Sequence, residues 1–148
     1  MDLNQITLNV TNFGAALSFY HRLGLSLIVL SEDRYARFEL PTGGATLSLH
    51  AAEVPTLNGP VTYFECENVD ATYERLRAIG IAFDTDPRDE PWLWREVRLR
   101  DPSGNKLCLY HAGGNRRFPP WRLDVVEPLP VRKTPRVTSS QAMILAYP

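Results

Sequence analysis

The sequence predicts an α+β fold built from two consecutive modules, each with the order strand, helix and three strands. This order occurs in residues 5–50 and again in residues 61–111. Val10 and Cys66 are separated by the same number of positions as Gly24 and Gly80. The stretch FELPTGGATLSLH in the first half also parallels VRLRDPSGNKLCLY in the second. Chance similarity of two α+β stretches is the alternative, but helix, glycine and turn coincide in the same order.

The first module begins with QITLNV (5–10), whose alternating apolar and polar residues are typical of a strand. The next stretch, residues 12–24, has apolar residues at helical spacing. Asn12 is placed to cap the helix at its start, and Gly24 lies just past its end. Three strands are expected to follow, at LSLIVL (25–30), YARFEL (35–40) and ATLSLH (45–50).

The second module repeats this pattern with a strand at VTYFECEN (61–68) and a helix at VDATYERLRAIG (69–80). Its remaining strands are expected at IAFDT (81–85), LWREVRLR (93–100) and NKLCLYH (105–111). The last two are joined by the turn DPSGN, in which Pro102 fixes φ and Gly104 tolerates positive φ.

The composition is that of an ordinary globular protein, with 148 residues, 44% hydrophobic and 22% charged. That length suits one domain, or two small modules that share a core. The net charge of −1 gives no reason to expect nucleic-acid or membrane partners. The start of the sequence lacks the pattern of a signal peptide, and no apolar stretch approaches a spanning helix. We therefore expect a cytoplasmic location.

The paired modules, with the local sequences FYHRLGL, NVDATYERLRAIG and DPSGNKLCLY, resemble the vicinal oxygen chelate superfamily. That superfamily includes glyoxalase I, extradiol ring-cleaving dioxygenases, and fosfomycin- and bleomycin-resistance proteins. The resemblance covers about residues 3–112 and implies that each module curls a mixed sheet into a cup, with its helix outside. We expect one domain over residues 1–114, with modules at about 3–52 and 60–112. These motifs specify a fold better than they specify a reaction.

Strand parity then assigns side chains to the inner face of each cup. In the first module the expected inward residues are Gln5, Thr7, Asn9, Arg37, Glu39, Thr46, Ser48 and His50. In the second module they are Val61, Tyr63, Glu65, Trp94, Glu96, Arg98, Lys106, Cys108 and Tyr110. The predicted ligand-binding residues are Gln5, Arg37, His50, Tyr63, Trp92, Trp94, Glu96, Arg98, Cys108 and Tyr110. Some of the inward charged side chains are expected to pair with one another.

The resemblance places metal ligands at four inward positions, which here are Gln5, Ser48, Val61 and Cys108. Only Gln5 matches the usual ligand types, and a valine cannot bind a metal. We therefore expect no metal ion and no other cofactor. A displaced site for a divalent metal remains an alternative, and its ligands would be Gln5, His50, Glu65 and Glu96.

The remaining reactive side chains have plain structural interpretations. His21 and His111 are expected at the surface, Cys66 in the core, and Cys108 as a wall of the cavity rather than a nucleophile. Trp92 and Trp94 would share one face of a strand and offer a flat wall to an aromatic ligand. Alternatively, Trp92 lies in the preceding loop and covers core or a dimer seam.

The first functional hypothesis is a metal-free binding protein that holds a small organic molecule in its cup. The second is a metal-dependent lyase or dioxygenase with relocated ligands, and the third is a dimeric scaffold whose cavity is filled. Exposed sheet edges favour a homodimer. After Gly114 the chain becomes rich in proline, with six of the twelve prolines. We expect residues 115–148 to form an extension that packs on the body or on a partner, with Trp121 as an anchor.

Overall fold

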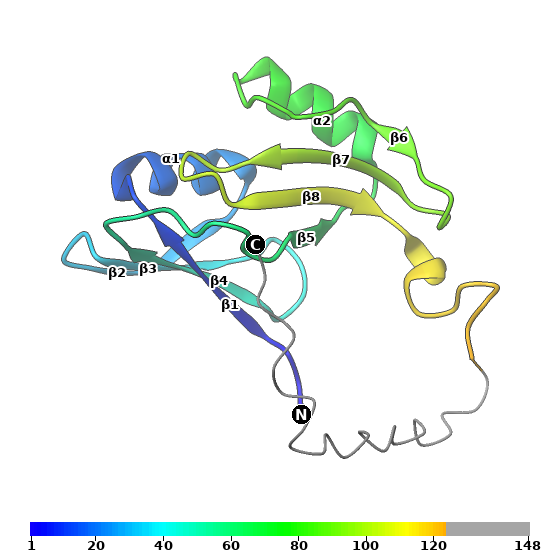
Figure 1. Cartoon of the computed structure of the whole chain (residues 1–148), viewed down its shortest axis with the longest axis horizontal. Helices are drawn as coiled ribbons and strands as arrows, with labels where there is room; N and C mark the ends of the chain where they lie inside the picture. Colours follow the sequence, from blue (N-terminus) through cyan, green and yellow to red (C-terminus); the bar gives the residue numbers. More distant parts are fainter. Residues whose placement is uncertain (124–148) are drawn as a thin grey trace, which may run out of the picture.

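The computed structural model describes residues 1–123 and contains two four-stranded sheets, each with one helix (Figure 1). The first module comprises β1 (Gln5–Val10), α1 (Phe13–Leu23), β2 (Ser26–Ser31), β3 (Tyr35–Glu39) and β4 (Thr46–Ala51). The second comprises β5 (Thr62–Glu65), α2 (Val69–Ala78), β6 (Arg88–Asp89), β7 (Arg95–Arg100) and β8 (Lys106–His111). A short 3₁₀ helix, η1 (Gly113–Arg116), follows.

The two sheets have the same topology, which confirms the predicted α+β fold and its internal repeat. The strand order is β1-β4-β3-β2 in the first sheet and β5-β8-β7-β6 in the second. In each module the first strand runs parallel to the last, and the other pairs are antiparallel. We call them sheet A (β1–β4) and sheet B (β5–β8).

Both helices begin and end close to the predicted positions. The side chain of Asn12 accepts a hydrogen bond from the Ala15 amide at 3.0 Å, and Asn68 accepts one from Ala71 at 2.9 Å. Gly24 adopts a φ of 110° just after α1, which glycine reaches without strain. Neither these helices nor any other part of residues 1–123 forms a helix long and apolar enough to cross a membrane.

The predicted strand at residues 81–85 is wrong. This segment runs beside β7 but forms only one backbone hydrogen bond to it, from the Asp84 amide to the Arg98 carbonyl at 2.8 Å. The hydroxyl of Thr85 accepts from the Arg98 amide at 3.1 Å, where a ladder would use a carbonyl. The alternation of Ile81 and Phe83 reflects contact with the core rather than strand pairing. Pairing begins only at β6.

A single core lies under both sheets and contains residues of both modules. The buried side chains of the first module include Val10, Tyr20, Phe38, Leu47 and Leu49. Those of the second include Val69, Leu76, Val97, Leu99, Leu107 and Leu109. The strand residues among them alternate with the predicted inward residues, so the predicted face assignment is confirmed for β3, β4, β7 and β8.

The turn between β7 and β8 joins the two modules. Its Asp101 is buried and accepts a hydrogen bond from the Tyr20 hydroxyl of α1 at 3.0 Å. The Asn105 side chain donates to the Asn9 carbonyl of β1 at 2.9 Å, and Ser103 accepts from the Thr11 amide at 2.9 Å. Figure 1 shows α1 lying beside this turn.

The predicted C-terminal extension falls mostly outside the described residues, which end at 123. Within the described part, Trp121 is 56% exposed and Phe118 is 63% exposed. The guanidinium of Arg122 lies 4.5 Å from the centre of the Phe118 ring. The anchoring role of Trp121 stays a prediction.

Candidate functional site on the inner sheet faces

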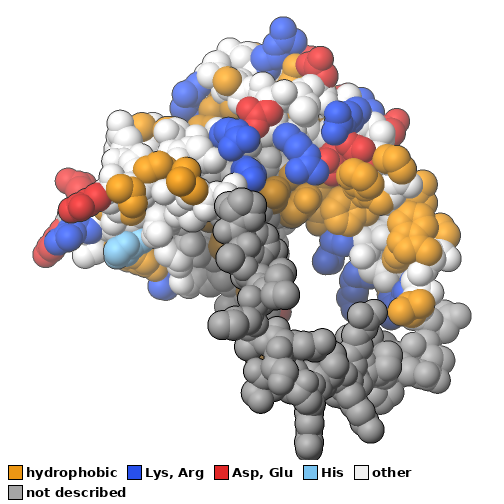
Figure 2. Space-filling model, in the orientation of Figure 1, with side chains coloured by type: hydrophobic (Ala, Val, Ile, Leu, Met, Phe, Trp, Pro, Cys, Tyr) orange, Lys and Arg blue, Asp and Glu red, His pale blue; other side chains and the backbone are white. Residues whose placement is uncertain are grey.

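Three aromatic rings gather on the inner face of sheet B. Trp94 and Tyr110 stack with ring centres 4.7 Å apart and an interplanar angle of 27°. Tyr63 meets Tyr110 edge-on at 5.7 Å and meets Trp94 edge-on at 6.1 Å. Tyr110 is buried, whereas Tyr63 stays 45% exposed. We call Tyr63, Trp94 and Tyr110 the aromatic wall. Figure 2 shows hydrophobic side chains at the surface near the ends of β7 and β8.

Trp92 does not join the aromatic wall. The strand β7 begins at Arg95, so neither Trp92 nor Trp94 lies within it, and the predicted strand start at residue 93 is wrong. The Leu93 amide donates to the Glu90 carbonyl at 2.9 Å, and Leu93 has a φ of 65°. This turn interrupts the two-residue alternation and leaves Trp92 exposed. The place beside Trp94 that Trp92 was expected to fill is taken instead by Tyr63 of β5.

Glu96 and Arg98 form the ion pair that was expected among the inward charges. Both Nη2 and Nε of Arg98 donate to Oε1 of Glu96, at 2.6 and 3.0 Å. Glu96 is buried, and its Oε2 has no hydrogen-bond partner within residues 1–123. The positive charge of Arg98 is therefore directed at this carboxylate.

Cys108 is fully buried on the same face, opposite Arg98 in the register. Burial, followed by the negative charge of Glu96, raises the pKa of its thiol to about 12. A thiol with this pKa stays protonated at neutral pH and is a poor nucleophile. The geometry thus favours the interpretation of Cys108 as part of the cavity wall.

Glu65 holds the chain where β8 leads into η1. Its Oε1 accepts from the amides of Gly113 and Ala112, at 2.9 and 3.3 Å. Its Oε2 lies 3.4 Å from Nε of Arg116, and the Tyr110 hydroxyl donates to the same atom at 3.5 Å. These bonds occupy the carboxylate and give it a structural role.

The inner face of sheet A is polar. The Tyr35 hydroxyl accepts from Nε and Nη2 of Arg37, at 3.0 and 2.7 Å, and lies 3.0 Å from the Ser48 hydroxyl. The bond to Ser48 and the neighbouring Arg37 lower the pKa of the Tyr35 phenol. Tyr35 was missed in the sequence analysis, although it lies two residues from Arg37 and shares its parity.

The other predicted inward residues of sheet A lie at its exposed margin. Gln5 is exposed, and its Oε1 accepts from the Thr46 hydroxyl at 3.5 Å. His50 is exposed and lies opposite Asn9 and Tyr35 in the register. Of the outward histidines, His21 is exposed on α1, and Nδ1 of His111 lies 2.9 Å from the Cys66 carbonyl.

The residues at the four expected metal positions do not fit a divalent cation. Ser48 is buried and hydrogen-bonded to Tyr35, Val61 packs beside Cys108 without a donor atom, and the Cys108 thiol is protonated. The alternative ligands divide between the sheets: Gln5 and His50 lie in sheet A, and Glu65 and Glu96 in sheet B. Within residues 1–123, no three His, Cys, Asp or Glu side chains are grouped to hold a metal ion.

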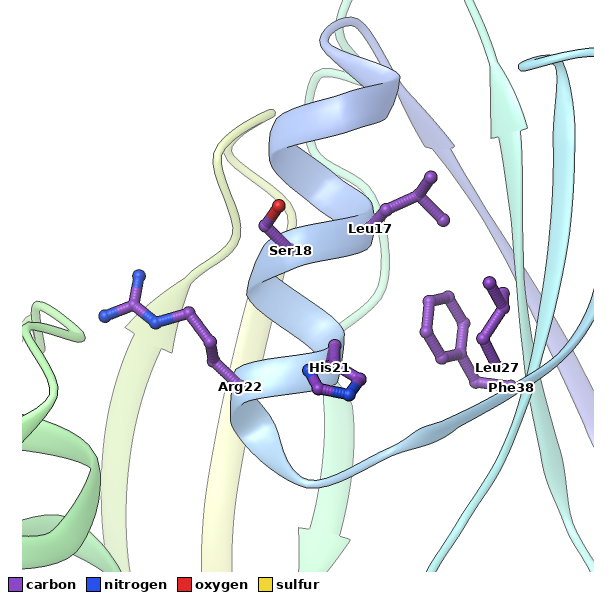
Figure 3. Close-up of a pocket in the computed structure, with 6 residues that line it drawn as sticks. All are labelled: Leu17, Ser18, His21, Arg22, Leu27 and Phe38. Carbon is purple, nitrogen blue, oxygen red and sulfur yellow. The ribbon is translucent and has the colours of Figure 1, made fainter.

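A surface hollow of about 440 Å³ lies elsewhere, on the helix side of sheet A (Figure 3). Its apolar lining comes from Leu17 of α1, Leu27 of β2 and Phe38 of β3. Leu27 and Phe38 are opposite each other in the register and face the helix. This hollow is therefore separate from the inner faces that carry the candidate site.

The chain matches the Glyoxalase/Bleomycin resistance protein/Dioxygenase superfamily over residues 2–109. It is 31% identical over 125 residues to Uncharacterized protein YraH of Bacillus subtilis (strain 168), covering 74% of this chain and 98% of that protein. A glyoxalase/bleomycin resistance protein/dioxygenase from Nocardioides has 27% identity and a TM-score of 0.64, covering 76% of this chain and 83% of the other.

A similar fold is found in the bleomycin resistance determinant encoded on transposon Tn5. That structure has 18% identity and a TM-score of 0.64, over 75% of this chain and 98% of the other. The match over residues 2–109 spans both modules and ends inside β8, one residue before Tyr110. The chain is therefore a member of the glyoxalase/bleomycin resistance protein/dioxygenase superfamily.

Proposed function

We propose that this protein binds a small organic molecule with a planar, aromatic part, and that it does so without a metal ion or other cofactor. The observation that carries the proposal is the aromatic wall, in which Trp94 stacks on Tyr110 and Tyr63 leaves part of its ring exposed. A flat, partly exposed group of rings favours stacking with a planar ligand.

The chemistry of the surrounding side chains supports binding over catalysis. The Cys108 thiol stays protonated, Glu96 is paired with Arg98, and Glu65 is held by backbone amides. The usual metal positions lack a set of anionic or imidazole donors. The side chains of sheet B therefore serve better as a recognition surface than as a metal-dependent lyase or dioxygenase centre.

We further propose that the protein is a homodimer in the cytoplasm. The strand β2 lies at the edge of sheet A, and four consecutive apolar residues in it are 39% to 52% exposed. These residues are Leu27, Ile28, Val29 and Leu30. An exposed apolar edge strand favours burial against another chain. Trp92 and Leu93 are exposed beside sheet B, and their burial against another chain would also be favourable.

The test is a fluorescence titration with a panel of neutral planar aromatic compounds. Ligand binding at the wall is expected to change tryptophan emission in the wild type. Trp94→Ala should weaken binding about five- to tenfold, because an aromatic pair contributes on the order of 1 kcal/mol. Trp92→Ala is the matched control, since Trp92 lies outside the wall and its loss should leave affinity unchanged.

Equal affinities in the wild type and Trp94→Ala would contradict the aromatic wall as the binding surface. Metal content is tested separately, by elemental analysis after dialysis against nickel, zinc, manganese and iron. One equivalent of tightly held metal, lost in His50→Ala, would instead favour the enzyme hypothesis with its displaced ligands.

A further inference from the structure

We propose that Arg37, Tyr35 and Ser48, on the inner face of sheet A, form a binding site for an oxyanion, such as the carboxylate of a small organic ligand. We call these three residues the anion site. The inference goes beyond the proposed function, because it concerns the inner face of sheet A, whereas the aromatic wall lies on sheet B. It predicts that the protein binds a small carboxylate through Arg37, whether or not a ring also stacks on the aromatic wall.

The two inward arginines, Arg98 and Arg37, differ in their partners. Arg98 lies 2.6 Å from the buried carboxylate of Glu96, so its charge is already neutralised. Arg37 forms no ion pair with any acidic residue in the described part of the chain, and its bonded partner is the neutral hydroxyl of Tyr35. A half-buried guanidinium without a carboxylate partner favours an anion.

Arg37 is held in a fixed position by its neighbours. Its Nε and Nη2 hold the Tyr35 hydroxyl at 3.0 and 2.7 Å, and that hydroxyl lies 3.0 Å from the buried Ser48 hydroxyl. Nη1 of Arg37 has no hydrogen-bond acceptor among residues 1–123. The three remaining N–H groups of Arg37, two on Nη1 and one on Nη2, are thus held in place before any ligand arrives. Such a set matches a carboxylate, which accepts two or more hydrogen bonds.

The residues next to Arg37 and Ser48 on the neighbouring strands are mostly neutral. Ser48 lies between Thr7 of β1 and Arg37 of β3 in the register, and His50 lies between Asn9 and Tyr35. Glu39 is the acid nearest in sequence on this face, but it is exposed and opposite Thr46. The pKa of the Tyr35 phenol is lowered first by the hydrogen bond with Ser48 and then by Arg37. An incoming anion therefore meets attraction rather than a paired charge.

The test compares three probes of similar size by calorimetry: benzoate, neutral benzyl alcohol and cationic benzylamine. Wild-type protein should bind benzoate most tightly. Arg37→Gln should reduce benzoate affinity about tenfold while leaving benzyl alcohol unchanged, because the loss affects one charge-assisted contact. Tyr35→Phe keeps the ring but removes the hydroxyl, and it should reduce benzoate affinity several-fold. Arg34→Gln is the matched control, since Arg34 is exposed outside the anion site.

Inorganic sulfate tests the anion site without any ring. In protein with ¹³C-labelled tyrosine, sulfate should shift the Tyr35 signal of the wild type, assigned by its loss in Tyr35→Phe. It should leave the Tyr35 signal of Arg37→Gln in place. No shift with sulfate, or a benzoate preference that survives in Arg37→Gln, would overturn the proposal. Benzyl alcohol reports on the aromatic wall alone, so its failure to bind would contradict the proposed function and not the anion site.

Discussion

At the scale of single residues, the thiol of Cys108 shows how the inner face of sheet B sets the chemistry of a side chain. On its own strand, the nearest cation of the same parity is Lys106, two positions away. The structure instead brings Glu96 near the thiol, and burial with that negative charge raises the thiol pKa to about 12. Cys108 and Glu96 lie on different strands, so their proximity follows from register, which sequence alone does not supply.

This arrangement predicts an unreactive thiol at Cys108. In a Cys66→Ser background, thiolate absorbance should be absent at pH 8, because the folded-state pKa lies well above the ordinary value of 9.0. Glu96→Gln should lower the pKa of Cys108, since it removes a negative charge that disfavours the thiolate. Titration of Cys108 near pH 8 in the Cys66→Ser background, or its rapid alkylation in that folded variant at the same pH, would contradict this interpretation.

At the scale of elements, local signals predicted the helices, and their tertiary contacts could not be predicted. The caps Asn12 and Asn68 and the turn DPSGN act through neighbours within a few residues. The strand prediction at 81–85 failed because contact with the core produces the same alternation as a ladder. The bond between Tyr20 and Asp101 spans 81 positions, and no local pattern announces it.

Because of the Tyr20–Asp101 bond, we expect two tyrosine variants to differ in their free energy of unfolding. Tyr20→Phe should lower the free energy of unfolding by about 1.5–3 kcal/mol, because a buried carboxylate loses a hydrogen-bond donor. Tyr73→Phe is the matched control on α2: its hydroxyl donates to Asp86, which is exposed, so the loss should be smaller. Urea denaturation of the two variants and the wild type measures the difference. Equal losses would show that the contact between α1 and the β7–β8 turn adds little.

At the scale of the whole molecule, the internal repeat made the two sheets and their inner faces predictable. The contents of those faces differ: sheet B carries an aromatic wall, and sheet A carries polar groups around Arg37. Composition and parity indicated this difference for Trp94 and Arg37. They left open whether Trp92 lies in the strand or in the preceding loop, and they could not indicate that Tyr35 holds Arg37, because both depend on backbone geometry and side-chain packing. A partner for the exposed apolar edge of β2 could not be predicted either, because such a partner would belong to another chain.

The proposed homodimer can be tested at the exposed edge of β2. Wild-type protein at micromolar concentration should scatter light with twice the mass of one chain. Leu30→Lys should weaken the dimer at least tenfold, because it places an uncompensated charge in an apolar contact on an edge strand. Leu57→Lys is the matched control, since Leu57 is 83% exposed in the linker between the modules. A monomeric wild type, or a dimer that survives Leu30→Lys as well as it survives Leu57→Lys, would exclude β2 as the surface on which two copies meet.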